Sequence, residues 1–161
     1  MAIPVYLFLY DDQNRLIKGD VDVQDRERSI EVLELMHAIE LPTDPFTGKT
    51  TGKCLHSSYA FEKEVDSSSP FLYEALTTGK TLKSAEFRFY NISHSGREVH
   101  YFTTLLEDVI ITEIEPFMMD IKDNRWMKNN HHEYIDLRYK KITWNYVDGN
   151  IMHTNTWQRR G

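Results

Sequence analysis

The sequence predicts a mainly β protein, a compact antiparallel β-barrel of two sheets with one flanking α-helix and a long protruding loop. Aromatic residues make up 12% of the 161 residues, and aromatic side chains favour strands. Strand-like runs follow one another along the chain, about eight or nine in all, and closing them into a barrel removes exposed sheet edges. One segment alone has helical spacing. The length is that of a single domain, residues 1–161.

The first strand-like runs are joined by polar turns. Ile3 to Tyr10 is almost continuously apolar, which is typical of a strand buried on both faces. Asp11-Asp12-Gln13-Asn14 then has the composition of a turn. In the next run, Ser29 to Glu40, the apolar positions change face partway. That shift predicts a bulge or burial on both faces.

A long loop, which we call the arm, follows at Leu41 to Lys53 and is rich in Pro, Thr, Gly and Lys. A loop of this length without structure of its own is usually functional or disordered. The next run, Leu55 to Val65, has charged residues around Phe61 and is expected to be an edge strand. The arm offers no chemistry, and we expect it to reach a neighbouring subunit.

The predicted helix begins near Ser69. Ser69 is a suitable N-cap, Pro70 suits the first helical position, and Gly79 can adopt the left-handed conformation that ends a helix. Between them lies an apolar stripe at helical spacing, made of Phe71, Leu72, Ala75 and Leu76. A helix of about three turns is expected to lie against the sheet.

Strands are predicted from there to the C-terminus. Ala85–Ile92 and Glu98–Leu106 flank Ser95-Gly96 and form a hairpin, and Val109–Ile114 continues the second strand past a bulge. Met118–His132 is polar and irregular.

A last hairpin closes the predicted fold. Tyr134–Val147 is expected to be one long strand, and Asp148-Gly149 a two-residue turn in which both positions need positive φ. Ile151–Trp157 returns beside it.

Composition excludes several classes of function. The net charge of −6 and the lack of a basic patch argue against a nucleic-acid partner. No apolar run reaches the ~20 residues of a membrane-spanning helix. Met1 to Tyr6 lacks the basic segment of a signal peptide, so we expect synthesis in the cytoplasm and no export by the ordinary signal route. The single Cys54 cannot form an internal disulfide.

Few residues suggest chemistry. In His131-His132-Glu133, neighbouring strand residues point to opposite faces, which favours a solvated loop end over a metal site. Gly48-Lys49-Thr50 and Gly79-Lys80-Thr81 lack the earlier Gly of a phosphate loop. Cys54 lies near His56, but a small side chain at a strand start is favoured over a nucleophile. We expect no catalytic residue, no cofactor and no metal.

Aromatic residues offer two interpretations. They could line a ligand pocket, but a barrel core with subunit contacts is favoured. The residues concerned are Tyr6, Phe8, Tyr10, Phe87, Phe89, Tyr90, Tyr101, Phe102, Trp144, Tyr146 and Trp157.

Short motifs along almost the whole chain form a specific series. They are Met1-Ala2-Ile3-Pro4-Val5-Tyr6-Leu7, Gly19 to Glu27, Ser29 to Leu35, Leu41-Pro42-Thr43-Asp44, Thr47-Gly48-Lys49, Phe61 to Glu64, Ser68 to Tyr73, Leu82 to Phe87, Lys141 to Trp144 and Tyr146 to Ile151. With this series the chain resembles the haemolysin-coregulated protein family, the tube subunit of bacterial type VI secretion systems.

The resemblance implies a structural role. Six copies form a ring, rings stack into a hollow tube, and a contractile sheath expels the tube together with a spike protein. Small effector proteins ride in the lumen. The subunit is cytoplasmic before firing and is then secreted without a signal peptide. Longer relatives carry a C-terminal toxin domain, and the end of this chain at Gly161 argues against a built-in enzymatic activity. The alternative is a small ligand- or metal-binding β-barrel enzyme.

The same resemblance points to three sets of contact residues. Phe46 is expected to fill a pocket of the neighbour, as part of a subunit interface formed by Leu41, Pro42, Thr43, Asp44, Phe46, Thr47, Gly48 and Lys49. Glu34 and Met36 are candidates for the lumen, and a Met there would make it more apolar and adaptable. Ring stacking is expected to use charged strand ends, for example Asp11, Asp12, Asp148, Arg159 and Arg160.

Overall fold

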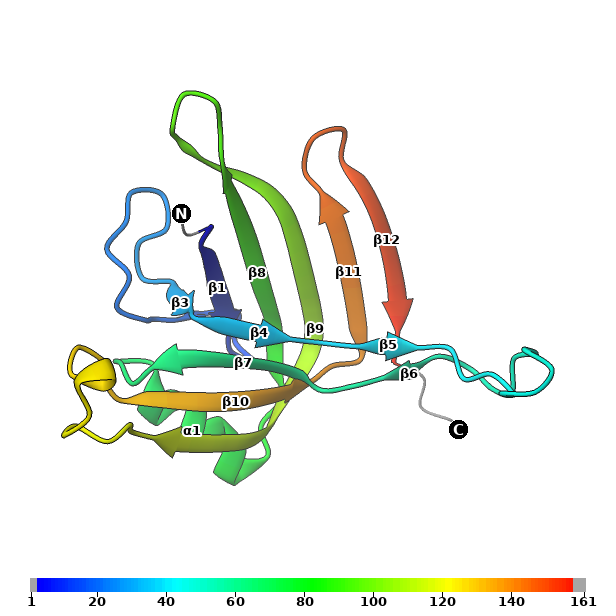
Figure 1. The fold of residues 1–161 in the computed structure, drawn as a ribbon, viewed down its shortest axis with the longest axis horizontal. Helices are drawn as coiled ribbons and strands as arrows, with labels where there is room; N and C mark the ends of the chain where they lie inside the picture. The colour runs from blue at the N-terminus through cyan, green and yellow to red at the C-terminus, as the bar shows by residue number, and fades with distance from the viewer. Residues whose placement is uncertain (1–2, 158–161) are drawn as a thin grey trace.

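The computed structural model describes residues 3–157 and has the predicted mainly β architecture (Figure 1). Its strands are β1 Val5–Tyr10, β2 Leu16–Ile17, β3 Ile30–Val32, β4 Glu34–Met36, β5 Ile39–Glu40, β6 Leu55–His56, β7 Tyr59–Glu64, β8 Leu82–Ile92, β9 Glu98–Phe117, β10 His132–Arg138, β11 Lys141–Tyr146 and β12 Ile151–Thr156. Its helices are α1, Ser69–Thr78, and a 3-10 turn, Asn124–Trp126. Within this part of the chain, no helix is long and apolar enough to cross a membrane.

Two antiparallel layers cross at a large angle and share β9 (Figure 1). The first half of β9 pairs with β8 and β11, and its second half pairs with β10, which pairs with β7. Asp108, with φ of 54°, lies between the halves, so the prediction of one long strand is confirmed, but the register against β8 does not shift there. The register shifts lie between Phe89 and Tyr90 of β8 and between Asp136 and Leu137 of β10, so the predicted position of the bulge is wrong. At the other side, β3 pairs with β1 and β4 pairs with β7. The segment from Ile30 to Met36 therefore joins both layers, as the barrel prediction requires.

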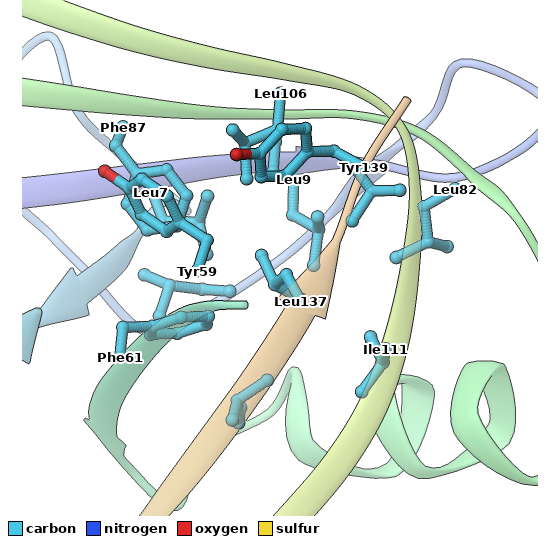
Figure 2. Packing of buried hydrophobic residues seen from close by; sticks show 14 of the residues in the cluster. Leu7, Leu9, Tyr59, Phe61, Leu82, Phe87, Leu106, Ile111, Leu137 and Tyr139 are labelled. Carbon is cyan, nitrogen blue, oxygen red and sulfur yellow. The ribbon is translucent and has the colours of Figure 1, made fainter. Parts of the chain in front are cut away.

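The barrel interior is a single aromatic and aliphatic core (Figure 2). The Phe87 ring lies 4.5 Å from Tyr59 and 5.5 Å from Phe61, measured between centroids. A smaller cluster lies where Val21 and Val23 pack against β1 and β8, and it contains Tyr6, Phe8 and Tyr90. These positions support a core role for many of the aromatic residues.

Two predicted strands are divided in the structure. The run from Ser29 to Glu40 becomes β3, β4 and β5, because the chain bends at Leu33, whose N–H donates to the Glu62 carbonyl at 2.8 Å. The prediction of one strand over Tyr134–Val147 is wrong. Tyr139 turns into the core between β10 and β11, and these strands lie in different layers.

The helix start and the last turn also differ in detail from the prediction. Ser68, not Ser69, is the N-cap, and Phe71 is 57% exposed, while Gly79 ends the helix with φ of 67° as expected. The β11–β12 turn spans four residues, because Tyr146 pairs with Ile151. Its positive φ angles belong to Gly149 and Asn150 rather than to Asp148.

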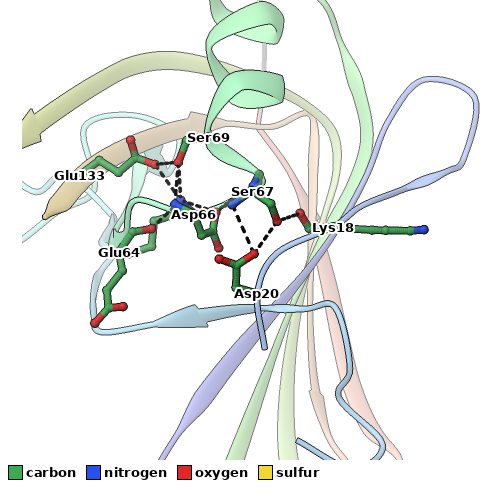
Figure 3. A network of polar contacts seen from close by, with 9 residues as sticks. Lys18, Asp20, Glu64, Asp66, Ser67, Ser69 and Glu133 are labelled. Carbon is green, nitrogen blue, oxygen red and sulfur yellow. Dashed lines mark hydrogen bonds and ion pairs between the residues drawn. The ribbon is translucent and has the colours of Figure 1, made fainter. Parts of the chain in front are cut away.

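The prediction that β7 is a charged edge strand is wrong as well. β7 lies between β10 and β4, and Lys63 is fully buried. The Lys63 ammonium lies 2.7 Å from Glu133 Oε2 and 3.1 Å from Asp66 Oδ1, and the Ser69 hydroxyl donates to Glu133 (Figure 3). Glu133 is therefore not at a solvated loop end but inside the barrel, 1% exposed.

Candidate subunit interface

The arm, Leu41 to Lys53, extends from a short two-stranded ladder at its root. β5 and β6 pair there, with Ile39 opposite His56 and Glu40 opposite Leu55. One further bridge joins Thr43 to Thr50. β5 and β6 flank the predicted loop, and the Thr43–Thr50 bridge lies within it, so the expectation of a loop without structure of its own is wrong at that bridge. Figure 1 shows the arm projecting beyond both layers.

A local turn shapes the tip of the arm. The Asp44 carboxylate accepts hydrogen bonds from the backbone N–H groups of Phe46, at 2.7 Å, and Thr47, at 3.0 Å. These bonds hold the pKa of Asp44 below its usual range. Gly48, with φ of 74°, lets the chain reverse and donate back to the Asp44 carbonyl at 2.9 Å. The tip thus has a defined backbone although nothing packs beneath it.

Apolar side chains of the arm face solvent. Phe46 is 94% exposed, and Leu41 at the root is 52% exposed. Exposed apolar groups on a projecting, shaped segment are typical of a contact made with another molecule. Among the predicted interface residues, Phe46 has by far the largest uncovered apolar surface. The structure brings the predicted arm residues together in one hairpin, and their contact with a neighbour stays a prediction.

Glu34 and Met36 lie on the outer face of the layer formed by β4, β7, β10 and the second half of β9. The two alternate with the inward Leu35, and Met36 is 69% exposed. Strand register places Glu62, Tyr134 and Glu115 beside Glu34, and Ala60, Asp136 and Glu113 beside Met36. This outer face therefore combines many carboxylates with the flexible Met36 side chain.

Neighbouring carboxylates on this face influence Tyr134. Its hydroxyl donates to Glu34 Oε2 at 3.5 Å. Burial, followed by the charges of Glu62 and Glu34, raises the pKa of Tyr134. Glu62 is in turn paired with His132 Nδ1 at 2.7 Å. Two carboxylates of this face, Glu34 and Glu62, thus have hydrogen-bond partners in Tyr134 and His132.

The candidate stacking residues lie at opposite ends of the layer formed by β1, β8, the first half of β9 and β11. Asp11 and Asp12 follow β1, where they pair with Arg15 at 3.2 Å and Lys80 at 3.3 Å within the same chain. Asp148 lies in the β11–β12 turn at the other end. Arg159 and Arg160 lie outside the described residues.

Candidates for chemistry stay apart in the fold. His132 faces outward to Glu62, whereas Glu133 faces inward to Lys63, so the His131-His132-Glu133 run does not converge. Gly48-Lys49-Thr50 lies in the arm tip, and Gly79-Lys80-Thr81 follows α1. Cys54 is exposed. Within residues 3–157, no group of three or more His, Cys, Asp or Glu side chains is placed to hold a metal ion.

Sequence reasoning missed the polar contacts at the arm root. There His37 and His56 both contact the buried Tyr139, and His56 stacks on Trp157 at 5.4 Å. The available signal was weak: a histidine at each end of a long loop. The partner Tyr139 lies far along the chain, and only the fold brings it there.

Comparison with known proteins identifies the family. A family model described as "Type VI secretion system effector, Hcp" matches residues 6–146, most of the chain. The chain belongs to the Hcp family. The "Major exported protein" of Pseudomonas aeruginosa strain PAO1 is 30% identical over 98% of this chain and 97% of its own length. Hcp proteins are structural and secreted, so a tube-protein role replaces the enzyme alternative.

Solved Hcp structures have the same fold as this chain. Hcp1 from the E. coli EAEC 042 pathovar is 54% identical, with a TM-score of 0.88 over 98% of this chain and all of that one. The secreted protein Hcp3 from Pseudomonas aeruginosa is 26% identical, with a TM-score of 0.80 over 98% of this chain and all of that one. The mainly β fold and the family resemblance are confirmed, and this Hcp chain is a protein of a type VI secretion system.

Proposed function

We propose that six copies of this Hcp protein form a ring and that rings stack into a hollow tube. The observation that carries the proposal is the projecting arm, whose Phe46 is 94% exposed. An arm that docks on a different face of the next subunit makes a head-to-tail contact, and such contacts generate closed rings when the rotation closes. The tip conformation set by Asp44 limits the entropy lost on docking.

Molar mass in solution tests the ring. Light scattering on a size-exclusion column, followed by negative-stain imaging, should give a mass of about six subunits and ring-shaped particles. Phe46→Ala should shift the population toward monomers at dilute concentration, because the apolar anchor is lost. Phe71→Ala is the matched control, since Phe71 is 57% exposed but lies on α1. Unchanged ring formation by Phe46→Ala would reject the anchor role, and a monomer that persists at high concentration would reject the ring.

The acidic outer face around Glu34 and Met36 is proposed to face the lumen. Small effectors would contact carboxylates and the adaptable Met36 side chain there, and electrostatic complementarity favours effectors with basic surfaces. Glu34→Lys should reduce co-purification of such an effector with the ring, while Glu74→Lys on α1 should leave it unchanged. If both variants retain the effector equally, the face around Glu34 does not line the lumen.

Expulsion follows from the same role. The tube is cytoplasmic before firing and leaves with the spike, driven by the contractile sheath and without a signal peptide. Contacts between rings at Asp11, Asp12 and Asp148 are proposed to be weaker than those within a ring, because the tube separates after delivery. Charged contacts of this kind are screened by salt. Raising the salt concentration should therefore separate stacked rings before it dissociates single rings, and the reverse order would contradict this assignment.

A further inference from the structure

The two strands of the arm leave the barrel beside a chain of hydrogen bonds. His37, before β5, places Nε2 2.8 Å from the Tyr139 hydroxyl. His56, in β6, places Nδ1 2.6 Å from the same hydroxyl and Nε2 2.9 Å from Asn155 Oδ1. Both sides of the arm root thus meet at Tyr139, which is only 5% exposed and belongs to the core.

Hydrogen-bond partners assign the protons of this chain. Asn155 Oδ1 is an acceptor, so the His56 Nε2–H donates to it. A neutral His56 then has an acceptor at Nδ1, and the Tyr139 hydroxyl donates there. The Tyr139 oxygen accepts from the His37 Nε2–H. With both imidazoles neutral, each of these contacts joins one donor to one acceptor.

An added proton on either imidazole disrupts this pairing of donors with acceptors. On His56 it must occupy Nδ1, which then becomes a second donor facing Tyr139. The Tyr139 hydroxyl proton loses its acceptor inside the barrel wall, and a buried donor without a partner is costly. With a proton also on His37, two positive rings would face one hydroxyl oxygen.

The surroundings do not compensate for positive charge. Tyr59 lies beside His37, with 4.9 Å between ring centroids, and His56 stacks on Trp157. Three of the charged side chains placed here are cations: Lys53 lines a groove with His56, the Arg138 guanidinium lies 4.9 Å from the centre of the Trp157 ring, and Lys140 lines a pocket with Tyr139. The carboxylate of Asp108 lines the same pocket as Tyr139. Among the described residues, no carboxylate makes a hydrogen bond or ion pair with either imidazole.

We infer that the His37–Tyr139–His56 chain is an acid-sensitive latch, which fixes the arm root at neutral pH and releases it when the imidazoles gain protons. The consequence for assembly rests on the proposed role of the arm: rings should loosen in acidic surroundings. The latch itself concerns the conformation of one chain and can be tested separately.

The direction of the pH effect agrees with the pKa shifts of His37 and Tyr139. Burial, then the neighbouring His56, lowers the pKa of His37, and burial raises the pKa of Tyr139, which stays a neutral O–H donor. An opened root binds more protons than the latched root at slightly acidic pH. The latched state of the root is therefore fully favoured above the ordinary imidazole pKa of about 6.5. It is lost as the pH falls toward the lowered pKa of His37.

Hydrogen exchange read by mass spectrometry tests the latch. Protection of the backbone amides in residues 37–58 is compared at about pH 7.5 and about pH 5.5, on either side of the ordinary imidazole pKa. Amides of β8 in the same molecule correct for the intrinsic pH dependence of exchange. The arm amides of the unaltered protein should lose about tenfold in protection in acid, as expected when one or two hydrogen bonds are lost.

Variants decide whether the two histidines are responsible. The double change His37→Gln with His56→Gln should abolish the pH dependence, whereas His153→Gln, an exposed histidine stacked on Trp144, should retain it. Persistence of the acid effect in the double variant, or its absence in the unaltered protein, would overturn the latch. If the double variant does not fold, NMR titration of the unaltered protein decides, because His37, His56 and the Tyr139 ring must then shift together.

Molar mass measured on the same samples separates the two proposals. Dissociation of rings together with loss of arm protection would support both. Loss of arm protection in a protein that forms no ring at any pH would support the latch and reject the ring.

Discussion

Phe87 in the barrel and Phe46 in the arm are both phenylalanines, but their surroundings are opposite. Phe87 is fully buried between Tyr59 and Phe61, whereas Phe46 is 94% exposed on a tip shaped by Asp44. The barrel covers Phe87 with aromatic side chains of the same chain. The arm has a defined backbone but no core beneath it, so its apolar surface stays open to solvent in the single chain.

Substituting each phenylalanine should separate stability from assembly. Phe87→Ala leaves a cavity in the core and should lower the free energy of unfolding by about 4 kcal/mol. Phe46→Ala should change it by less than about 0.5 kcal/mol, because an exposed side chain contributes little to the fold. Urea denaturation of the dilute, dissociated subunit measures both. A large loss for Phe46→Ala would show that the arm packs on its own barrel.

The buried Lys63 gives the next largest effect. Lys63→Met leaves Glu133 as an uncompensated charge inside the barrel and should cost about 3 kcal/mol. Replacing Lys63→Met together with Glu133→Leu should recover part of this loss, because it removes the most deeply buried carboxylate and leaves only Asp66 without its Lys63 partner. The same denaturation experiment applies. Equal loss in the single and double variants would mean that packing, not charge, governs this part of the core.

This contrast also explains how far the sequence predicts the molecule. Most strands follow from local patterns, and so the barrel, its helix and the single long strand through Asp108 are predicted correctly. Lys63 and Glu133 occupy core positions beside Phe61 and Ile135, where local pattern assigns charged residues to solvent. Their pairing spans 70 residues of sequence, and only the three-dimensional fold shows it.

In the candidate interface, too, some features follow from local sequence and others only from the fold. Length and composition mark the arm, because a Pro- and Gly-rich segment between two strands is a local signal. The pairing of Thr43 with Thr50 and the meeting of His37 and His56 at Tyr139 depend on the path of the whole chain. The proposed contact of Phe46 with a second copy depends on an assembly and not on one sequence.

Two glycines sharpen the comparison at a smaller scale. A Cβ added at Gly19 would collide with the Ser29 carbonyl oxygen and lie 2.8 Å from Ile30 Cγ1, so Gly19→Ala should cost about 1–3 kcal/mol. In the arm, a Cβ at Gly52 would meet nothing closer than Pro42 Cγ at 3.7 Å. Gly52→Ala should therefore change the free energy of unfolding by less than about 0.5 kcal/mol. Thermal and urea unfolding check both, and similar losses would mean that the arm is as tightly packed as the barrel.

The smallest effect concerns the tip of the arm at low pH. Backbone N–H groups of Thr47 and Phe46 hold the pKa of Asp44 below its ordinary value of 3.8. The turn is therefore favoured above that value and is lost as the pH falls through the lowered pKa, when the carboxylate gains a proton. NMR shifts of the Phe46 and Thr47 amides should follow this change with a midpoint below 3.8, well separated from imidazole titration at the root. In Asp44→Asn the acid step should vanish while the root transition stays. A single transition shared by tip and root would instead show that the arm opens as one unit, with no independent turn at Asp44.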